Sequence, residues 1–138
     1  MKKIVFALFL VLSAVNLLAG AMPPEDELKT LEAKVDKLMA AYNEGVPKAF
    51  YADFAKSISA FCTPQNFKMI FVDHYMKNFG AYKSRKIIET QTVVNPDSPN
   101  GLLVYIAQFE KNASVKLAIN LFKEDGEWRF QQVTIQPM

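Results

Sequence analysis

The chain has one cysteine and one histidine among its 138 residues. A single cysteine cannot close an intramolecular disulfide, so the disulfide-stapled class of small secreted domains is excluded. A zinc site needs clustered His, Cys or carboxylate ligands and a calcium loop needs regularly spaced oxygen ligands, and the sequence has neither pattern. We therefore predict no metal and no cofactor. Cys62 is either a small, half-buried apolar residue or one half of a disulfide between two copies.

Net charge is also nearly absent. The chain has 16 basic and 14 acidic residues, and without Lys2 and Lys3 of the leader described below it has 14 of each sign. This balance excludes the broad positive field that gathers nucleic acid or anionic lipid, so we predict no nucleic-acid partner. A local basic cluster remains at Lys77, Lys83, Arg85 and Lys86. It is either a solvated helix end and edge strand or a patch for an anion or a partner.

The first 21 residues have the three parts of an export signal. Two lysines precede an apolar run over residues 4–18, and Ala19-Gly20-Ala21 has small residues where a signal peptidase cleaves. The run is short for a membrane span of about 20 residues, and alanine stands where a lipoprotein has its lipid-bearing cysteine. We predict a cleaved signal peptide at 1–21, with an uncleaved anchor as the alternative. The rest, 22–138, is one periplasmic or secreted domain without a stable membrane anchor.

Three helices are predicted at the start of this domain. Apolar residues at spacings of three and four, with glycine at position 45, predict a long amphipathic helix over 23–45. A stripe of Phe50, Phe54, Ile58 and Phe61 predicts a second helix over 47–61. Thr63 before Pro64 is typical of a helix start, and aromatic residues at every fourth position predict a third helix that ends at Gly80. Ile70, Val72 and Met76 are expected to widen its buried face.

From Tyr82 onward the apolar period changes to two and β-branched residues become frequent. This pattern predicts strands near 84–94, 102–109, 115–122 and 128–135. Asp125-Gly126 is a strong hairpin signal before the last strand. The predicted fold class is α+β, with three N-terminal helices packed on a four-stranded antiparallel sheet.

Both faces of this sheet are expected to be partly apolar. Strict alternation along the last strand puts Trp128 and Phe130 on one face and Val133 and Ile135 on the other. One face should pack on the helices. The other is too apolar for free solvent, so we expect it to pair with a second copy in a homodimer.

Polar side chains that could line a pocket between helices and sheet are Tyr75, Tyr82, Tyr105, Gln108, Asn120 and Gln132. The alternative is that most of them are hydrogen-bonded structural residues. For catalysis, His74 is the sole imidazole and would act with Tyr75. Asp73 and His74 are adjacent, and adjacent residues on a helix point in different directions, so they cannot serve one substrate without a third group.

The order of elements resembles the nuclear-transport-factor-2-like (cystatin-like) superfamily, in which helices and a curved sheet form a cone. The similarity is sharpest at 79–83 (FGAYK) and 123–129 (KEDGEWR), which look like small exported bacterial families of unknown function. The resemblance implies a curved sheet and a homodimer formed through the open sheet face. Enzymatic members place an Asp, a His or tyrosines inside the cone. His74 with Asp53 or Asp73 and a tyrosine is the only such combination here.

Three functions are compatible with these observations. The first, which we favour, is an exported, non-catalytic homodimeric module that binds a small apolar ligand or an envelope protein. The second is a cofactor-free enzyme of the isomerase or dehydratase type that transfers protons in the cone pocket. The third is a structural role in the envelope with no pocket at all.

Overall fold

The computed structural model describes residues 20–138, so the predicted signal peptide lies outside the described residues except for its last two positions. The first helix, α2 (Glu25–Glu44), follows Pro24 and has three acidic residues in its first turn, where carboxylates interact favourably with the helix dipole. Gly45 ends it with φ of 70°, a conformation that costs glycine least. The long helix predicted over 23–45 is confirmed.

The second predicted helix is interrupted. α3 (Pro47–Phe50) is one short turn, and η1 (Lys56–Phe61) is a separate 3₁₀ helix. Between them the chain pairs with Phe130: Phe130 N donates to Asp53 O at 2.9 Å, and Ala55 N donates to Phe130 O at 2.8 Å. Because these backbone groups are bonded to a strand, they cannot join a helical ladder. The prediction of one continuous helix over 47–61 is wrong for this reason.

The third predicted helix is present over 64–79. It consists of α4 (Pro64–Phe67), the π-helical η2 (Lys68–Met76) and α5 (Lys77–Phe79), which follow one another without a break. Thr63 begins it, because its Oγ1 accepts a hydrogen bond from Asn66 N at 3.1 Å. Gly80 ends it with φ of 77°. This whole segment is called the base helix below.

Five antiparallel strands follow: β1 (Tyr82–Ile87), β2 (Val93–Val94), β3 (Asn100–Phe109), β4 (Asn112–Glu124) and β5 (Glu127–Pro137). The order across the sheet is β1-β3-β4-β5, and β2 pairs with β3. The predicted strand 84–94 is therefore two strands. Thr92 explains the split, because its hydroxyl accepts from Val104 N at 3.1 Å and replaces a backbone partner beside β3.

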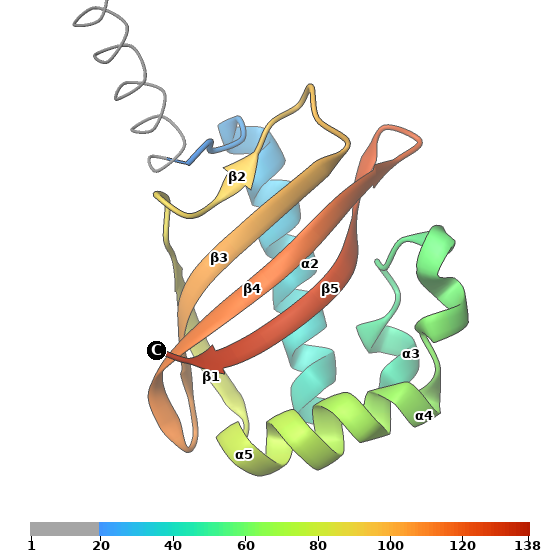
Figure 1. The fold of residues 1–138 in the computed structure, drawn as a ribbon, viewed down its shortest axis with the longest axis vertical. Coiled ribbons are helices and arrows are strands. Elements are labelled where there is room, and N and C mark those ends of the chain that lie inside the picture. Colours follow the sequence, from blue (N-terminus) through green and yellow to red (C-terminus); the bar gives the residue numbers. More distant parts are fainter. Residues whose placement is uncertain (1–19) are drawn as a thin grey trace, which may run out of the picture.

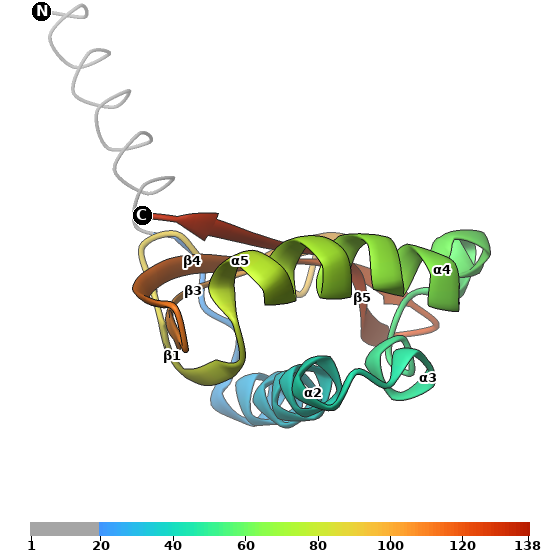
Figure 2. The ribbon, with the colours of Figure 1, turned by 90° about the horizontal axis from the view of Figure 1, so that it is seen from below.

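The elements form two layers. α2 lies along one face of the sheet, and the base helix crosses the lower end of the sheet (Figures 1 and 2). Between residues 20 and 138 no helix covers the opposite face, which is turned to the viewer in Figure 1. The core therefore fills the space between α2, the base helix and the inner face of the sheet. Its largest fully buried side chains include Tyr42, Phe50, Phe67, Tyr105, Phe109 and Phe130.

A bulge in β5 changes which side chains face the core. Leu121 pairs with Phe130 but Asn120 pairs with Gln132, so Gln131 is an extra residue in the ladder. A bulge of this kind shifts the alternation by one residue, and Val133 and Ile135 are consequently buried on the same face as Phe130. The strict alternation predicted for this strand is wrong. The open face is less apolar along β5 than expected, although Leu102, Ile106 and Phe122 remain partly exposed on it.

Candidate functional site

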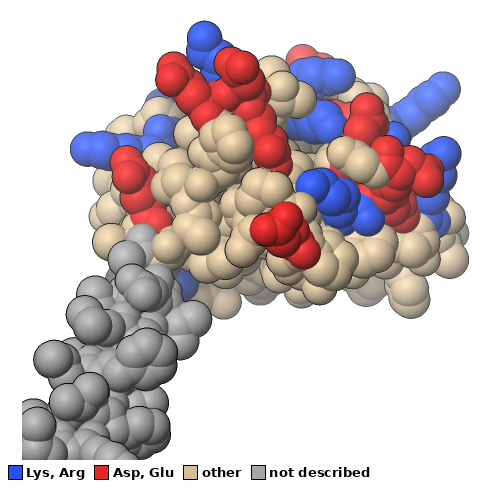
Figure 3. Space-filling view, turned by 90° about the horizontal axis from the view of Figure 1, so that it is seen from above, with Lys and Arg blue, Asp and Glu red and all other residues tan. Residues whose placement is uncertain are grey.

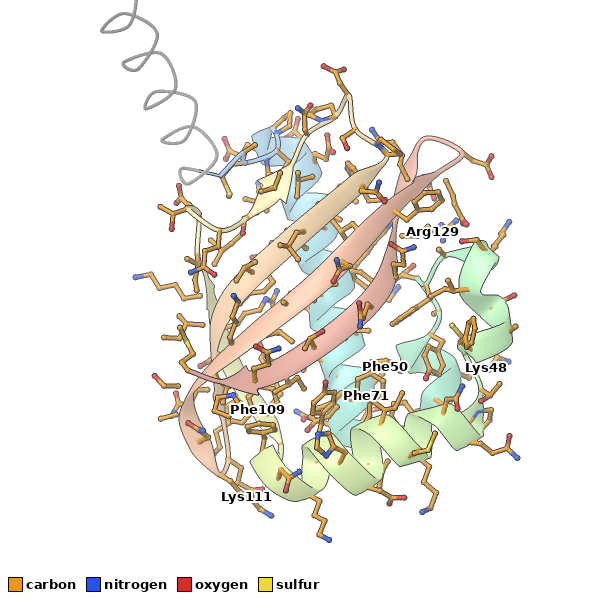
Figure 4. All side chains as sticks on the ribbon, in the orientation of Figure 1. Lys48, Phe50, Phe71, Phe109, Lys111 and Arg129 are labelled. Carbon is orange, nitrogen blue, oxygen red and sulfur yellow. The ribbon has the colours of Figure 1, made fainter. Side chains whose placement is uncertain are left out.

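An open pocket lies between β5, η1 and the base helix. Phe50 and Phe71 form its inner support, with ring centroids 4.4 Å apart, in the space between β5 and the base helix (Figure 4). Phe50 also contacts Phe54 and Phe67. These rings fill the interior of the fold, and only the outer end of the space remains open.

We call this hollow the β5 pocket. Its lining comes from Tyr51, Phe54, Ile58, Phe61 and Cys62, from Ile70, Phe71 and Tyr75 of the base helix, and from Gln131, Gln132 and Val133 of β5. The lining has no Asp, Glu, Lys, Arg or His side chain, and burial raises the pKa of the Cys62 thiol and raises the pKa of Tyr51 to about 12. The volume is about 190 Å³, below the roughly 300 Å³ at which typical small-molecule sites begin. The pocket has the size and chemistry for a small apolar group.

The rim of the β5 pocket exposes apolar side chains. Phe61 is 70% exposed and Ile70 is 39% exposed, and both line the pocket. Met69, next to Ile70, is 60% exposed. Phe61, Ile70 and Val72 were expected to be buried, but the helix containing Phe61 is interrupted and the inner face of the base helix is already occupied by its aromatic residues. A contiguous exposed apolar rim of this kind is typical of an interaction site.

The wall formed by η1 is held by a carboxylate from another part of the chain. Glu124, at the end of β4, accepts hydrogen bonds from Lys56 N at 3.0 Å and Ser57 N at 3.1 Å. η1 itself has no fully buried residue. Its position therefore depends on this contact, on the strand pairing that precedes it and on the packing of the partly buried Ile58 against the core.

We expect Glu124→Gln to loosen η1, because glutamine keeps one acceptor oxygen where two are needed. The hydrogen bond from Lys56 N lowers the pKa of Glu124, with Ser57 adding to it. A carboxyl whose pKa is lowered by folding stabilises the folded form above its unfolded pKa, and the contribution is lost as pH falls through the lowered value. The protection of the Lys56 and Ser57 amides, taken relative to the intrinsic exchange rate at each pH, should fall several-fold in the variant, and in the wild type only as pH falls below 4.5, the ordinary value. Glu127→Gln, in the same hairpin but without contact to η1, should leave both amides unchanged.

The structure brings two of the six predicted pocket residues to the β5 pocket. Tyr75 lines it from the base helix and Gln132 from β5. His74 does not line it. The imidazole is exposed, and its Nδ1 lies 3.2 Å from Asn78 Nδ2. The pocket therefore offers tyrosine hydroxyls and a thiol, but no imidazole and no carboxylate as a general base.

Two other predicted residues, Tyr82 and Tyr105, belong to a polar cluster around Arg85 between β1, β3 and α2. Arg85 donates to Tyr82 Oη at 2.9 Å and forms ion pairs with Glu32 and Asp36. Tyr105 donates to Glu32, and burial, followed by that hydrogen bond, raises the pKa of Tyr105. Each of these side chains has a partner in the cluster, although Arg85 Nε is buried without one, and the contacts join α2 to the sheet.

The last two predicted residues, Gln108 and Asn120, lie on the open face of the sheet, opposite Ser84 and Leu102 in the ladder. Neither of them lines the β5 pocket. Tyr51, Ile58 and Gln131 also line the β5 pocket, and the sequence alone did not predict this. The alternating pattern of β5 does not indicate the bulge at Gln131. The helical spacing of Phe50, Phe54, Ile58 and Phe61 likewise does not indicate the break at Asp53.

A second hollow, beside Trp128, carries charges. It lies between the start of α2 and the β4–β5 hairpin, with a volume of about 290 Å³. Its polar groups already have partners: Trp128 Nε1 donates to Glu27, Lys34 Nζ donates to Trp128 O at 3.0 Å, and Lys123 Nζ lies 4.8 Å from the centre of the Trp128 ring. These contacts hold the β4–β5 hairpin against the start of α2.

Charge and metal ligands give no competing site in the part of the chain that the structure describes. Acidic and basic side chains are interleaved over the face in Figure 3 rather than gathered by sign. In the predicted basic cluster, Arg85 is turned inward to Glu32 and Asp36 and is therefore not part of an exposed patch. Among residues 20–138 no group of three potential ligands could hold a metal ion. Within the same range, no helix has the length and apolar character to cross a bilayer.

Comparison with known proteins leaves the geometry of the β5 pocket as the basis for any functional conclusion. No protein-family model matches the chain, and no curated protein is significantly similar to it in sequence.

Proposed function

We propose that the protein is an exported, non-catalytic binding module and that the β5 pocket takes an apolar group of its ligand or protein partner. One observation carries the proposal: an open pocket with an exposed apolar rim is lined without a single charged side chain. Apolar surface in such a place is stabilised when it is covered by another apolar surface. The lack of an imidazole or carboxylate in the lining favours binding over proton transfer.

The resemblance to the nuclear-transport-factor-2-like superfamily belongs to the same proposal. The order of a long helix, a base helix and an antiparallel sheet supports it, as does the glycine end of the base helix within 79–83. We propose that the sheet is the curved wall of a cone whose interior is filled by aromatic rings and whose mouth is the β5 pocket. Leu102, Ile106 and Phe122 on the uncovered sheet face support a homodimer formed through that face.

A charge placed in the β5 pocket should abolish binding of an apolar probe. Ile70→Asp puts a carboxylate in the lining, and a bound apolar ring would strip its water without supplying a partner. We expect the Kd for Nile red, measured by fluorescence titration, to rise at least about tenfold, since burying an uncompensated polar group costs more than about 1.4 kcal/mol.

Val72→Asp is the matched control. Val72 lies on the same helix with the same exposed fraction, 39%, as Ile70, but it does not line the β5 pocket. Its variant should bind Nile red as the wild type does. Equal binding by both variants, or no saturable binding by the wild type, would contradict the proposed function.

A further inference from the structure

The two edges of the sheet differ in charge and in length. β1 carries Lys83, Arg85 and Lys86 within six residues, and β2 is only two residues long. Charged or very short edge strands are how proteins prevent unwanted strand pairing. On β5, by contrast, no residue from Phe130 to Met138 carries a charged side chain.

The β5 edge is also open along most of its length. At the start of β5 the outer backbone groups are bonded, because Phe130 pairs with residues 53–55 through the parallel bridge and Trp128 O accepts a hydrogen bond from Lys34 Nζ. Beyond that bridge, residues 131–137 have no backbone partner other than β4 within the described range 20–138. At Phe130 this edge already pairs with an extended segment, residues 53–55. That segment turns away into η1 after a single bridge, so the rest of the edge stays unpaired by it.

The open edge and the β5 pocket are continuous. Gln131, Gln132 and Val133 belong both to the edge strand and to the pocket lining. In a strand paired with β5, alternate side chains would point to the inner side of the sheet, where the pocket opens. The small volume of the pocket matches an apolar side chain better than a free ligand.

We propose that β5 between Gln131 and Pro137 is a docking edge for an extended, uncharged segment of a protein partner, which adds a strand there and inserts an apolar side chain into the β5 pocket. Main-chain hydrogen bonds supply affinity in this mode of recognition and the pocket supplies specificity. Charge selects the occupant: neither the pocket nor the strand offers a counter-charge, so a charged segment would be dehydrated without compensation. This inference rests on the proposed function, because it takes the β5 pocket as the binding site.

The test begins with phage-displayed random heptapeptides selected on the protein purified from cells that express the full chain. We expect uncharged sequences with apolar residues at alternate positions. Bound peptide should slow hydrogen exchange of the outward-facing amides among residues 131–136 at least about tenfold, because these amides become bonded. Nile red, which can place only part of its ring system in the pocket and the rest on the apolar rim, has no peptide backbone and should not slow it. Methylation of alternate backbone nitrogens in the peptide should weaken binding on the order of a hundredfold, since about three hydrogen bonds are lost and each costs about 1 kcal/mol.

The outcomes separate the two proposals. If Nile red binds and Ile70→Asp blocks it, but selection yields no peptide, a charged consensus or peptides that leave the β5 amides unprotected, the docking edge is overturned and the proposed function stands. If Nile red does not bind either, the proposed function fails with it. Exchange at residues 131–137 that slows with protein concentration alone, together with a dimer in native mass spectrometry, would assign the edge to a second copy and overturn the peptide partner.

Discussion

Phe50→Ala should destabilise the protein by about 4 kcal/mol, the largest effect we expect from one substitution. Phe50 is 1% exposed and its ring contacts Tyr51, Phe54, Phe67 and Phe71. Removing the ring leaves a cavity where α3, the base helix and residues 53–55, which pair with β5, come together. These elements are tied by the chain and cannot collapse fully into the cavity, so the cost includes lost contacts as well as lost burial.

Urea or thermal unfolding of the full chain measures this effect. The midpoint temperature should fall by about 15 °C, because 1 kcal/mol corresponds to roughly 4 °C in a domain of this size. Phe61→Ala is the matched control, since Phe61 is 70% exposed and should change stability by less than about 0.5 kcal/mol. Similar losses in the two variants would show that the Phe50 ring is not the centre of the core.

Arg85→Ala should cost about 3 kcal/mol, the second-largest effect. The Arg85 side chain is 9% exposed, and it bonds to the Glu32 carboxylate, to Glu32 O and to Tyr82. Burial alone lowers the pKa of Arg85, but the hydrogen bond to Tyr82 and the neighbouring carboxylates raise it, so the guanidinium is charged at every pH at which the protein folds. Removing it leaves Glu32 and Tyr82 without their shared donor. The contact with Asp36, which is 71% exposed, contributes little because solvent screens it.

Chemical denaturation of three variants tests this expectation. Arg85→Lys should recover only part of the loss, since an ammonium cannot present the planar fork that reaches several partners at once. Lys86→Ala removes an exposed cation from the same strand and should change stability by less than about 0.5 kcal/mol. Full recovery in Arg85→Lys would mean that charge, rather than the geometry of the guanidinium, holds α2 to the sheet.

The candidate site was only partly predictable from the sequence. Tyr75 and Gln132 were identified as pocket residues, and both line the β5 pocket. Tyr82 and Tyr105 have the same residue type as Tyr75, but Arg85 and Glu32 take up their hydroxyl groups. Composition and spacing cannot separate these cases, because the difference is which residue of a distant strand or helix lies next to each hydroxyl.

Local chemistry determined the elements whose ends depend on neighbouring residues. Gly45 and Gly80 end helices because they adopt positive φ, and the Asp125-Gly126 turn joins β4 to β5 for the same reason. The apolar periods of three to four and of two likewise located the long helix and the strands. Each of these signals involves residues within one or two turns of each other, and a single sequence contains all of that information.

Tertiary structure alone decided where the predicted second helix breaks and which way β5 faces. Residues 53–55 leave a helical pattern because Phe130, far along the chain, offers backbone hydrogen bonds to them. Val133 and Ile135 turn to the core because the bulge at Gln131 lets four apolar side chains share one face. In both cases a long-range contact outweighed the local preference. At residues 53–55 the contact bonds backbone groups, and in β5 it buries apolar side chains that strict alternation would leave exposed. The β5 pocket exists because of these two departures.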